Sequence, residues 1–353
     1  MINNIFNYAT SELSQDAFLC WLLSYAKKDA KEDKGLRDCA INFIKDIIPS
    51  LTNSKGDIFV SDIERQYNNI DVLFTVNDNY VVIIENKTFS SEHSNQLVRY
   101  TDIITTDPKF GKYELFKVLY KTGFQSNISF IEEAGFKFIG LEQIMKLFAP
   151  YVSRTENQIF QDYYSYWDNF NKTVMEYTEL PVNKWGWQHI NGFYRDFKKS
   201  GIIGKAGFDT DFDYVANPRG GLYAMWMSND SFLYYNEQKY ELYLQLEFSE
   251  GKFQLCLRTG IKQEEGIDTD VTPGDLRNFL TYYISESGKW IYTLSEYGFV
   301  KPDRFGTGAT MTIGVIPLNE KTWIEVKNCV SDVINKFPQI INSINARKTK
   351  GSS

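Results

Sequence analysis

The stretch that decides the fold is residues 69–100, NIDVLFTVNDNYVVIIENKTFSSEHSNQLVRY. Two runs of β-branched and apolar residues, IDVLFTV and YVVIIEN, precede and follow Asn77-Asp78-Asn79. Runs of this composition favour strands, and asparagine and aspartate favour turns, so the stretch predicts a β-hairpin. A loop of these three residues places Asp71 directly opposite Glu85, with Cβ atoms about 4.5–5.5 Å apart.

Two acidic side chains facing each other are the unusual feature of this hairpin. Lys87 lies two residues beyond Glu85 and therefore points to the same face of the strand. At about 5 Å and an effective dielectric constant near 20, the repulsion between the acids is on the order of 3 kcal/mol. A hard divalent cation bound between Asp71 and Glu85 removes this repulsion. Two acids and a lysine around such a cation are suited to the hydrolysis of a phosphodiester bond.

These residues carry a resemblance to a known family. Asp71, followed after thirteen residues by Glu85-Asn86-Lys87, resembles the D…ExK core of the PD-(D/E)XK nuclease superfamily. Residues 96–100, QLVRY, resemble the QxxxY helix of its RecB-like members, and residues 10–23, TSELSQDAFLCWLL, resemble the opening helix of one uncharacterised bacterial branch. The resemblance covers about residues 1–150 and implies an α/β fold, with a restriction-endonuclease-like mixed β-sheet core flanked by helices.

The resemblance also implies roles for the core residues. Asp71 and Glu85 are expected to bind Mg²⁺ or Mn²⁺, the carbonyl of Asn86 to add a ligand, and Lys87 to orient or help deprotonate the attacking water. Glu12, rather than Asp16, is implied as an extra metal ligand or as a residue that orients the water. An acid at this place also favours a helix N-terminus through the helix dipole, and that alternative stays open.

The helix after the ExK strand supplies a second set of candidates. Gln96 and Tyr100 are four residues apart and therefore lie on one helix face. The resemblance implies that both are catalytic residues that face the active site, whereas ordinary polar surface is the alternative. Arg99, on the adjacent face, is expected to contact a phosphate.

Composition restricts the class of protein. The 353 residues, 43% of them hydrophobic, fit two domains better than one. We expect a cytoplasmic protein, because no apolar run approaches the length of a membrane span and the N-terminus lacks the features of a signal peptide. Four scattered cysteines and two histidines argue against a zinc site and a Ser-His-Asp triad. A net charge of −7 argues against a non-specific DNA coat but leaves room for a local basic groove.

The domain prediction follows the change in pattern along the chain. We predict a nuclease-like domain at residues 1–178, a C-terminal α+β accessory domain for substrate recognition at 179–346, and a disordered tail at 347–353. In the first domain, alternation of strands and helices after the hairpin implies parallel strands joined by crossovers. Its predicted helices lie at 12–26, 36–48, 94–104, 141–148 and 157–177, and its other strands at 57–67, 114–120 and 136–140. The second domain is predicted to hold strands at 222–227, 232–235, 240–248, 253–258 and 310–316, and helices at 272–286 and 321–344.

A basic stretch with interleaved aromatic residues opens the second domain, at residues 181–206. Two interpretations stay open: phosphate contact combined with base stacking, or a helix with an aromatic core face and a basic solvent face. The basic candidates for nucleic-acid binding are Lys184, Arg195, Lys198 and Lys199, and the interleaved aromatic residues are Trp185, Trp187, Phe193, Tyr194 and Phe197.

The hypothesis that these patterns favour is a metal-dependent nuclease acting on DNA, with RNA left open. Its setting, by resemblance, is defence against foreign DNA, with repair or recombination as the alternative. A nuclease fold that serves only as a binding or regulatory module is a further hypothesis, which the intact Asp71, Glu85 and Lys87 disfavour. A purely structural role is disfavoured because Lys87 cannot easily satisfy both acids. A homodimer or a protein partner stays open.

Overall fold

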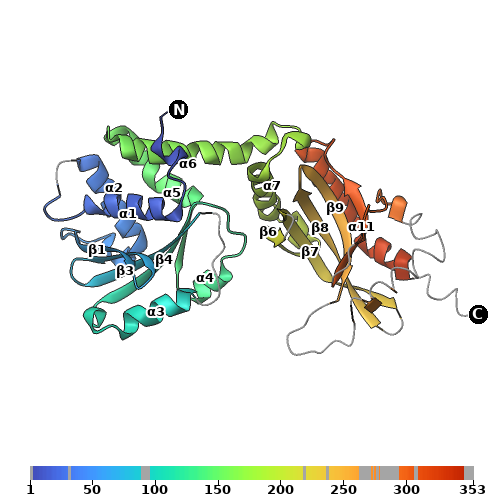
Figure 1. The fold of residues 1–353 in the computed structure, drawn as a ribbon, viewed down its shortest axis with the longest axis horizontal. Coiled ribbons are helices and arrows are strands. Elements are labelled where there is room, and N and C mark those ends of the chain that lie inside the picture. Colours follow the sequence, from blue (N-terminus) through green and yellow to red (C-terminus); the bar gives the residue numbers. More distant parts are fainter. Residues whose placement is uncertain are drawn as a thin grey trace, which may run out of the picture. The chain divides into compact units, whose positions relative to one another are not determined.

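The computed structural model describes residues 3–30, 33–88, 96–217, 220–235, 238–261, 294–305 and 309–345, with isolated positions between 271 and 279. The chain divides into two compact units, Met1–Lys172 and Thr173–Ser353, each with a sheet and helices of its own (Figure 1). The predicted domain limits at 178 and 346 stay predictions. The predicted helix at 272–286 lies almost wholly outside the described residues, and the predicted tail at 347–353 lies entirely outside them.

The sheet of the first unit is mixed, as the sequence predicts. Its strands follow the chain in the order β1-β2-β3-β4-β5, with two antiparallel pairings followed by two parallel ones. The predicted hairpin is formed by β2 and β3, and its register runs from Val76 opposite Tyr80 to Val72 opposite Ile84. The strands are β1 Val60–Tyr67, β2 Ile70–Val76, β3 Tyr80–Lys87, β4 Glu114–Lys121 and β5 Lys137–Gly140.

Helices cover both faces of this sheet (Figure 1). On one face Phe43 of α2 packs edge-on against Tyr120 of β4, and on the other Leu97 and Ile104 of α3 share a core with Ile83 of β3. Strands β2 and β3 are therefore almost continuously buried, which explains their unbroken apolar runs. The helices are α1 Glu12–Ser24, α2 Lys34–Ile47, α3 Gln96–Thr106, α4 Ser129–Glu133, α5 Leu141–Phe148 and α6 Gln158–Met175, with 3₁₀ turns at Ile5–Asn7, Pro49–Leu51, Pro108–Phe110 and Ala149–Arg154.

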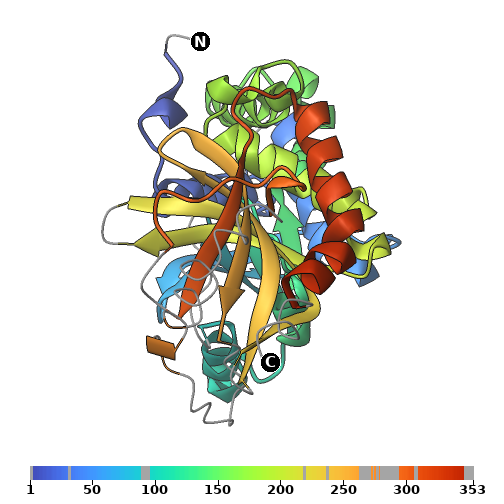
Figure 2. The ribbon, with the colours of Figure 1, turned by 90° about the vertical axis from the view of Figure 1, so that its right-hand side faces the viewer.

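The second unit is an antiparallel sheet, and its helices pack against the sheet around one hydrophobic core (Figure 2). Inward-facing residues of the central strands, such as Leu244 and Leu255, share this core with Phe193 of α7 and Phe337 of α11. The strand order is β10-β9-β8-β7-β6. The elements are α7 Trp187–Lys199, α8 Ile202–Lys205, β6 Asp209–Asn217, β7 Gly220–Tyr235, β8 Gln238–Ser249, β9 Lys252–Gly260, β10 Thr310–Pro317 and α11 Trp323–Asn345, with 3₁₀ turns at Glu176–Thr178 and Val182–Lys184.

One prediction for this sheet is wrong, and one strand was missed. The strands predicted at 222–227 and 232–235 form one strand, β7, whose pairing with β8 shifts between Met227 and Ser231. The polar residues at the shift resemble a turn in sequence, but a bulge absorbs them without ending the ladder. Strand β6 was not predicted, because its acidic residues lower its strand propensity.

Base stacking by the aromatic residues of the basic stretch is also wrong for most of them. The side chains of Trp185, Phe193, Tyr194 and Phe197 are buried in the core of the second unit, and the half-buried ring of Trp187 stacks on Tyr223. The alternative is confirmed, namely a helix with an aromatic core face. Within the described ranges, no helix is long and apolar enough to cross a membrane.

Candidate active site

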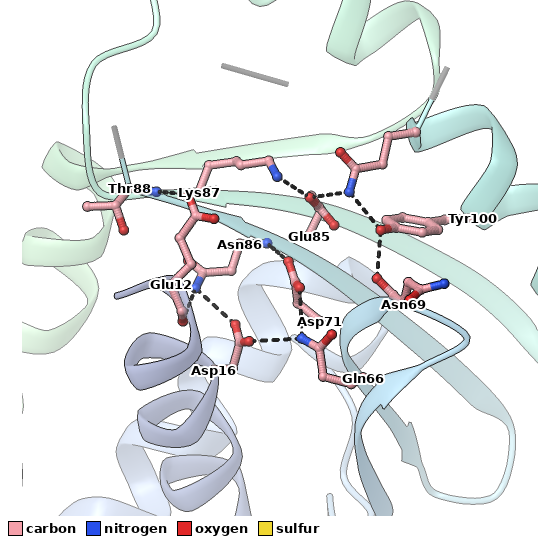
Figure 3. Close-up of polar contacts among 11 residues, drawn as sticks. Glu12, Asp16, Gln66, Asn69, Asp71, Glu85, Asn86, Lys87, Thr88 and Tyr100 are labelled. Carbon is pink, nitrogen blue, oxygen red and sulfur yellow. Dashed lines mark hydrogen bonds and ion pairs between the residues drawn. The ribbon is translucent and has the colours of Figure 1, made fainter. Parts of the chain in front are cut away.

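The candidate site lies where the middle strands of the first sheet end (Figure 3). Strand β2 runs antiparallel to β3, so Asp71 near the start of β2 lies at the same edge as Glu85 to Lys87 at the end of β3. The carboxyl ends of parallel strands are the usual position of ligand sites in α/β sheets. Helix α1 approaches this edge from one side and α3 from the other.

Both oxygens of Asp71 are held by hydrogen bonds. The backbone N–H of Asn86 donates to Oδ2 at 2.8 Å, and the side-chain amide of Gln66 donates to Oδ1 at 3.0 Å. Donors on two different strands thus fix the rotation of the Asp71 carboxylate. The predicted hairpin register is confirmed, because Val72 lies opposite Ile84 and the same register places Asp71 opposite Glu85.

Glu85 is a buried acid that is only half satisfied. Glu85 lies near the end of β3, and only 1% of the residue is exposed. Oε1 accepts hydrogen bonds from Lys87 Nζ at 2.7 Å and from Gln96 Nε2 at 2.8 Å, whereas Oε2 has no partner among the described residues. Burial, together with the charge of Asp71, raises the pKa of Glu85 to about 8. An unsatisfied buried carboxylate oxygen is costly, so this atom favours a proton or a bound cation.

Lys87 remains a cation in this environment. Burial lowers its pKa, but the hydrogen bond and charge of Glu85, with the charges of Glu12 and Asp71, outweigh burial and hold the pKa above its usual value. The ammonium group is therefore charged at neutral pH, although the residue is 9% exposed.

Helix α1 binds the ExK strand through two acids. Glu12 accepts the backbone N–H of Thr88 on Oε1 at 3.0 Å, and its carbonyl oxygen accepts Asn86 Nδ2 at 2.9 Å. Asp16, which is fully buried, accepts the same Asn86 amide on Oδ1 at 2.9 Å and the Gln66 amide on Oδ2 at 3.2 Å. Burial and the charge of Asp71 raise the pKa of Asp16 to about 6. The sequence ranks Glu12 above Asp16, but the structure brings both acids to the site.

Helix α3 contributes a chain of hydrogen bonds on the opposite side. Gln96 Nε2 lies 2.6 Å from the hydroxyl of Tyr100, which donates to the carbonyl oxygen of Asn69 at 2.6 Å. Both side chains face Glu85, as the resemblance implies, and the buried Tyr100 is not polar surface. Burial raises the pKa of Tyr100, so the phenol keeps its proton. Arg99 is exposed, with its guanidinium 5.3 Å from the centre of the Tyr100 ring.

The four basic candidates for nucleic-acid binding belong to the second unit. Arg195 pairs with Asp196 at 2.9 Å and Lys198 with Asp211 at 3.2 Å, while Lys184 and Lys199 are exposed. Their role stays a prediction.

The sequence interpretation missed two contributors, both in the β1–β2 hairpin. Gln66 falls opposite Asp71, between the strand pairs of Arg65 with Val72 and of Tyr67 with Ile70. Asn69 supplies only its carbonyl oxygen. The asparagine pair before β2 is a turn signal that fixes this register, so the position of Gln66 opposite Asp71 could have been predicted from the sequence. The contact made by the backbone carbonyl of Asn69 could not.

Among the described residues, no three acidic, histidine or cysteine side chains form a complete metal site. The set that could hold a cation is therefore sparse and consists of oxygen donors. It comprises the Asp71 and Glu85 carboxylates and the backbone carbonyl of Asn86.

These features define an α/β protein of restriction-endonuclease-like fold, with an acid–acid–lysine centre at the edge of a mixed sheet. Residues 3–177 match the family model of the PD-(D/E)XK nuclease superfamily, and this part of the chain belongs to that superfamily. Comparisons with curated proteins and with solved structures give no match. The family points to a nuclease, a hydrolase whose substrate is a nucleic acid.

Proposed function

We propose that the protein is a divalent-cation-dependent nuclease that hydrolyses phosphodiester bonds in DNA. The observation that carries the proposal is the Glu85 carboxylate, which is buried beside Asp71 with Oε1 bound by Lys87 and Oε2 without a partner in the described part of the chain. Two close acids, one with a free buried oxygen, favour a cation. A decayed site that serves only for binding has no need to keep this costly arrangement.

The donor set fits a hard divalent cation. Asp71, Glu85 and the carbonyl of Asn86 offer oxygen atoms only, which suits Mg²⁺, with Mn²⁺ as a substitute. When bound, the cation supplies Lewis-acid polarisation of the phosphate and neutralises developing negative charge. Oε1 of Glu12 already accepts the backbone N–H of Thr88, so we do not count Glu12 among the cation ligands. We assign it the role of orienting the attacking water.

The chain's own residues would then place and polarise the reactants. The Lys87 ammonium would donate a hydrogen bond to the attacking water or to a non-bridging phosphate oxygen, and stabilise the charge that develops on the phosphate. Gln96 would hold Glu85 in place, and the neutral phenol of Tyr100 would hold Gln96. Arg99, exposed beside Tyr100, is a candidate contact for a neighbouring phosphate.

Two further parts of the proposal are the choice of DNA as substrate and the biological setting. The basic residues Lys184, Arg195, Lys198 and Lys199 support a nucleic-acid contact by the second unit but do not distinguish DNA from RNA. Defence against foreign DNA rests on the resemblance alone.

Cleavage of supercoiled plasmid tests the proposal. Wild type, Lys87→Ala and the control Lys146→Ala, an exposed lysine on α5, are compared in Mg²⁺, Mn²⁺ and EDTA. We expect nicking or linearisation that requires the cation, is unaffected in the control, and falls by on the order of 10²–10³-fold in Lys87→Ala because a charge-stabilising donor is lost. Wild type that cleaves neither plasmid, single strands nor RNA with any cation would contradict the proposal and favour the binding module.

A further inference from the structure

Gln66 bridges the two acids that approach the site from α1 and β2. Its Nε2 donates to Asp71 Oδ1 at 3.0 Å and to Asp16 Oδ2 at 3.2 Å (Figure 3). Both carboxylates accept from the same nitrogen and therefore lie close together, where like charges repel each other. A primary amide matches this arrangement because it has two N–H donors and no charge.

The backbone at Gln66 is held in an unfavourable conformation. Its φ is +60°, in the left-handed region that a residue with a Cβ rarely adopts. A residue in such a conformation costs of order 1–3 kcal/mol and persists only where its surroundings impose it. Glycine would remove that cost, but glycine has no amide to place between the two acids.

The same turn also holds the other acid of the site. Asn68 and Asn69 follow Gln66 with φ of +49° and +69°, and the carbonyl oxygen of Asn69 accepts the Tyr100 hydroxyl. Tyr100 contacts Gln96, which donates to Glu85. The β1–β2 turn thus contacts Asp71 through the side chain of Gln66. It is linked to Glu85 through Tyr100 and Gln96 of α3.

We propose that Gln66 is a positioning residue, which fixes the Asp71 carboxylate in the rotation that binds the divalent cation. Asp71 has two restraints, the Asn86 N–H on Oδ2 and the Gln66 amide on Oδ1. Without the amide, repulsion from Asp16 turns the carboxylate away from the Asn86 N–H, and the remaining hydrogen bond weakens. The consequence for cation binding rests on the proposed function, whereas the orientation of Asp71 does not.

Gln66→Gly tests the proposal, because it removes the amide and also relieves the left-handed backbone. The control is Asn68→Gly, which relieves the same kind of backbone two residues further along the chain and whose side chain is exposed. Thermal unfolding first establishes that both variants fold, which we expect because glycine relieves the left-handed backbone at either position. A variant that loses activity only because it unfolds is thereby recognised.

The deciding measurement is hydrogen exchange of the Asn86 amide in cation-free protein, since that N–H donates to Asp71. We expect exchange at least about tenfold faster in Gln66→Gly and unchanged in Asn68→Gly, because hydrogen bonds to a charged group are worth about 1.5–3 kcal/mol. Calorimetric affinity for Mn²⁺ should fall by about the same factor, with cleavage restored in part at saturating Mn²⁺. Unchanged Asn86 exchange, or unchanged Mn²⁺ affinity, overturns the proposal. Wild type that neither binds Mn²⁺ nor cleaves overturns the proposed function instead, and the Asn86 exchange still decides the role of Gln66.

Discussion

At the scale of single residues, the site depends on where charge is compensated and where it is not. Lys87 and Gln96 satisfy one oxygen of Glu85, and two N–H donors satisfy Asp71. The second oxygen of Glu85 has no hydrogen-bond partner among the described residues. Because burial and Asp71 both disfavour its charge, Glu85 binds a proton or a cation more readily than an exposed glutamate does.

The raised pKa of Glu85 predicts how stability depends on pH without a cation. The pKa rises from 4.5 to about 8 on folding, so between these pH values the folded state holds a proton that the unfolded state has released. Folding stability therefore falls as pH rises through this window. Asp16, raised from 3.8 to about 6, adds a loss of the same sign at lower pH.

Urea unfolding in EDTA between about pH 5 and pH 9 checks this expectation. Wild type should lose stability more steeply over this range than Glu85→Gln, whose amide does not titrate. Added Mg²⁺ should restore wild type most at the alkaline end, where the cation replaces the lost proton. Parallel curves for the two proteins would contradict the assignment of the proton to Glu85.

The limits of sequence interpretation at this scale have a physical cause. Asp71, Glu85 and Lys87 were found because strand periodicity and hairpin register place side chains without knowledge of tertiary packing. Asp16 was ranked below Glu12 because its contacts arise where α1 meets the β1–β2 hairpin, and no local pattern specifies how a helix packs against a sheet edge. The contact of Gln66 with Asp16 depends on the same packing, although the hairpin register alone places Gln66 opposite Asp71.

At the scale of elements, the strongly periodic segments were predictable and the polar strands were not. The helix at 141–148 was predicted with the limits that it has in the structure, because its apolar residues follow helical spacing. The bulge in β7 and the acidic strand β6 owe their structure to pairing with the adjacent strands, which the local composition does not specify.

One contact between elements gives a sharp test of the second unit's packing. A Cβ on Gly192 of α7 would lie 2.2 Å from the carbonyl oxygen of Val174, in the last turn of α6. Gly192→Ala should therefore force the two helices apart and cost about 1–3 kcal/mol of unfolding free energy. Gly204→Ala in α8 is the matched control, since nothing lies within 4 Å of its added Cβ. The control should be neutral or gain up to about 1 kcal/mol from better helix propensity. Equal unfolding midpoints in urea for the two variants would show that α6 and α7 do not pack closely at Gly192.

At the scale of the whole molecule, the candidate site and the basic stretch lie in different units. The first unit holds all of the acids and Lys87, and the family match ends close to where the second unit begins. The second unit holds the exposed Lys184 and Lys199, whose residue type suits phosphate contact. This division of residues predicts that cation binding and DNA binding can be changed separately.

The double variant Lys184→Ala/Lys199→Ala tests this separation in the full-length chain. If both lysines contact phosphates, DNA affinity falls and the slope of log K against log salt becomes shallower by about 1.8, since each phosphate contact contributes about 0.9. Mn²⁺ affinity should be unchanged, because the residues proposed to hold the cation lie in the first unit. Lys327→Ala/Lys336→Ala on α11 is the control, because it removes the same charge from the same unit. A control slope that changes as much as the test slope would mean that net charge acts on DNA at long range. An unchanged slope in the test variant would instead place the DNA contacts elsewhere in the chain.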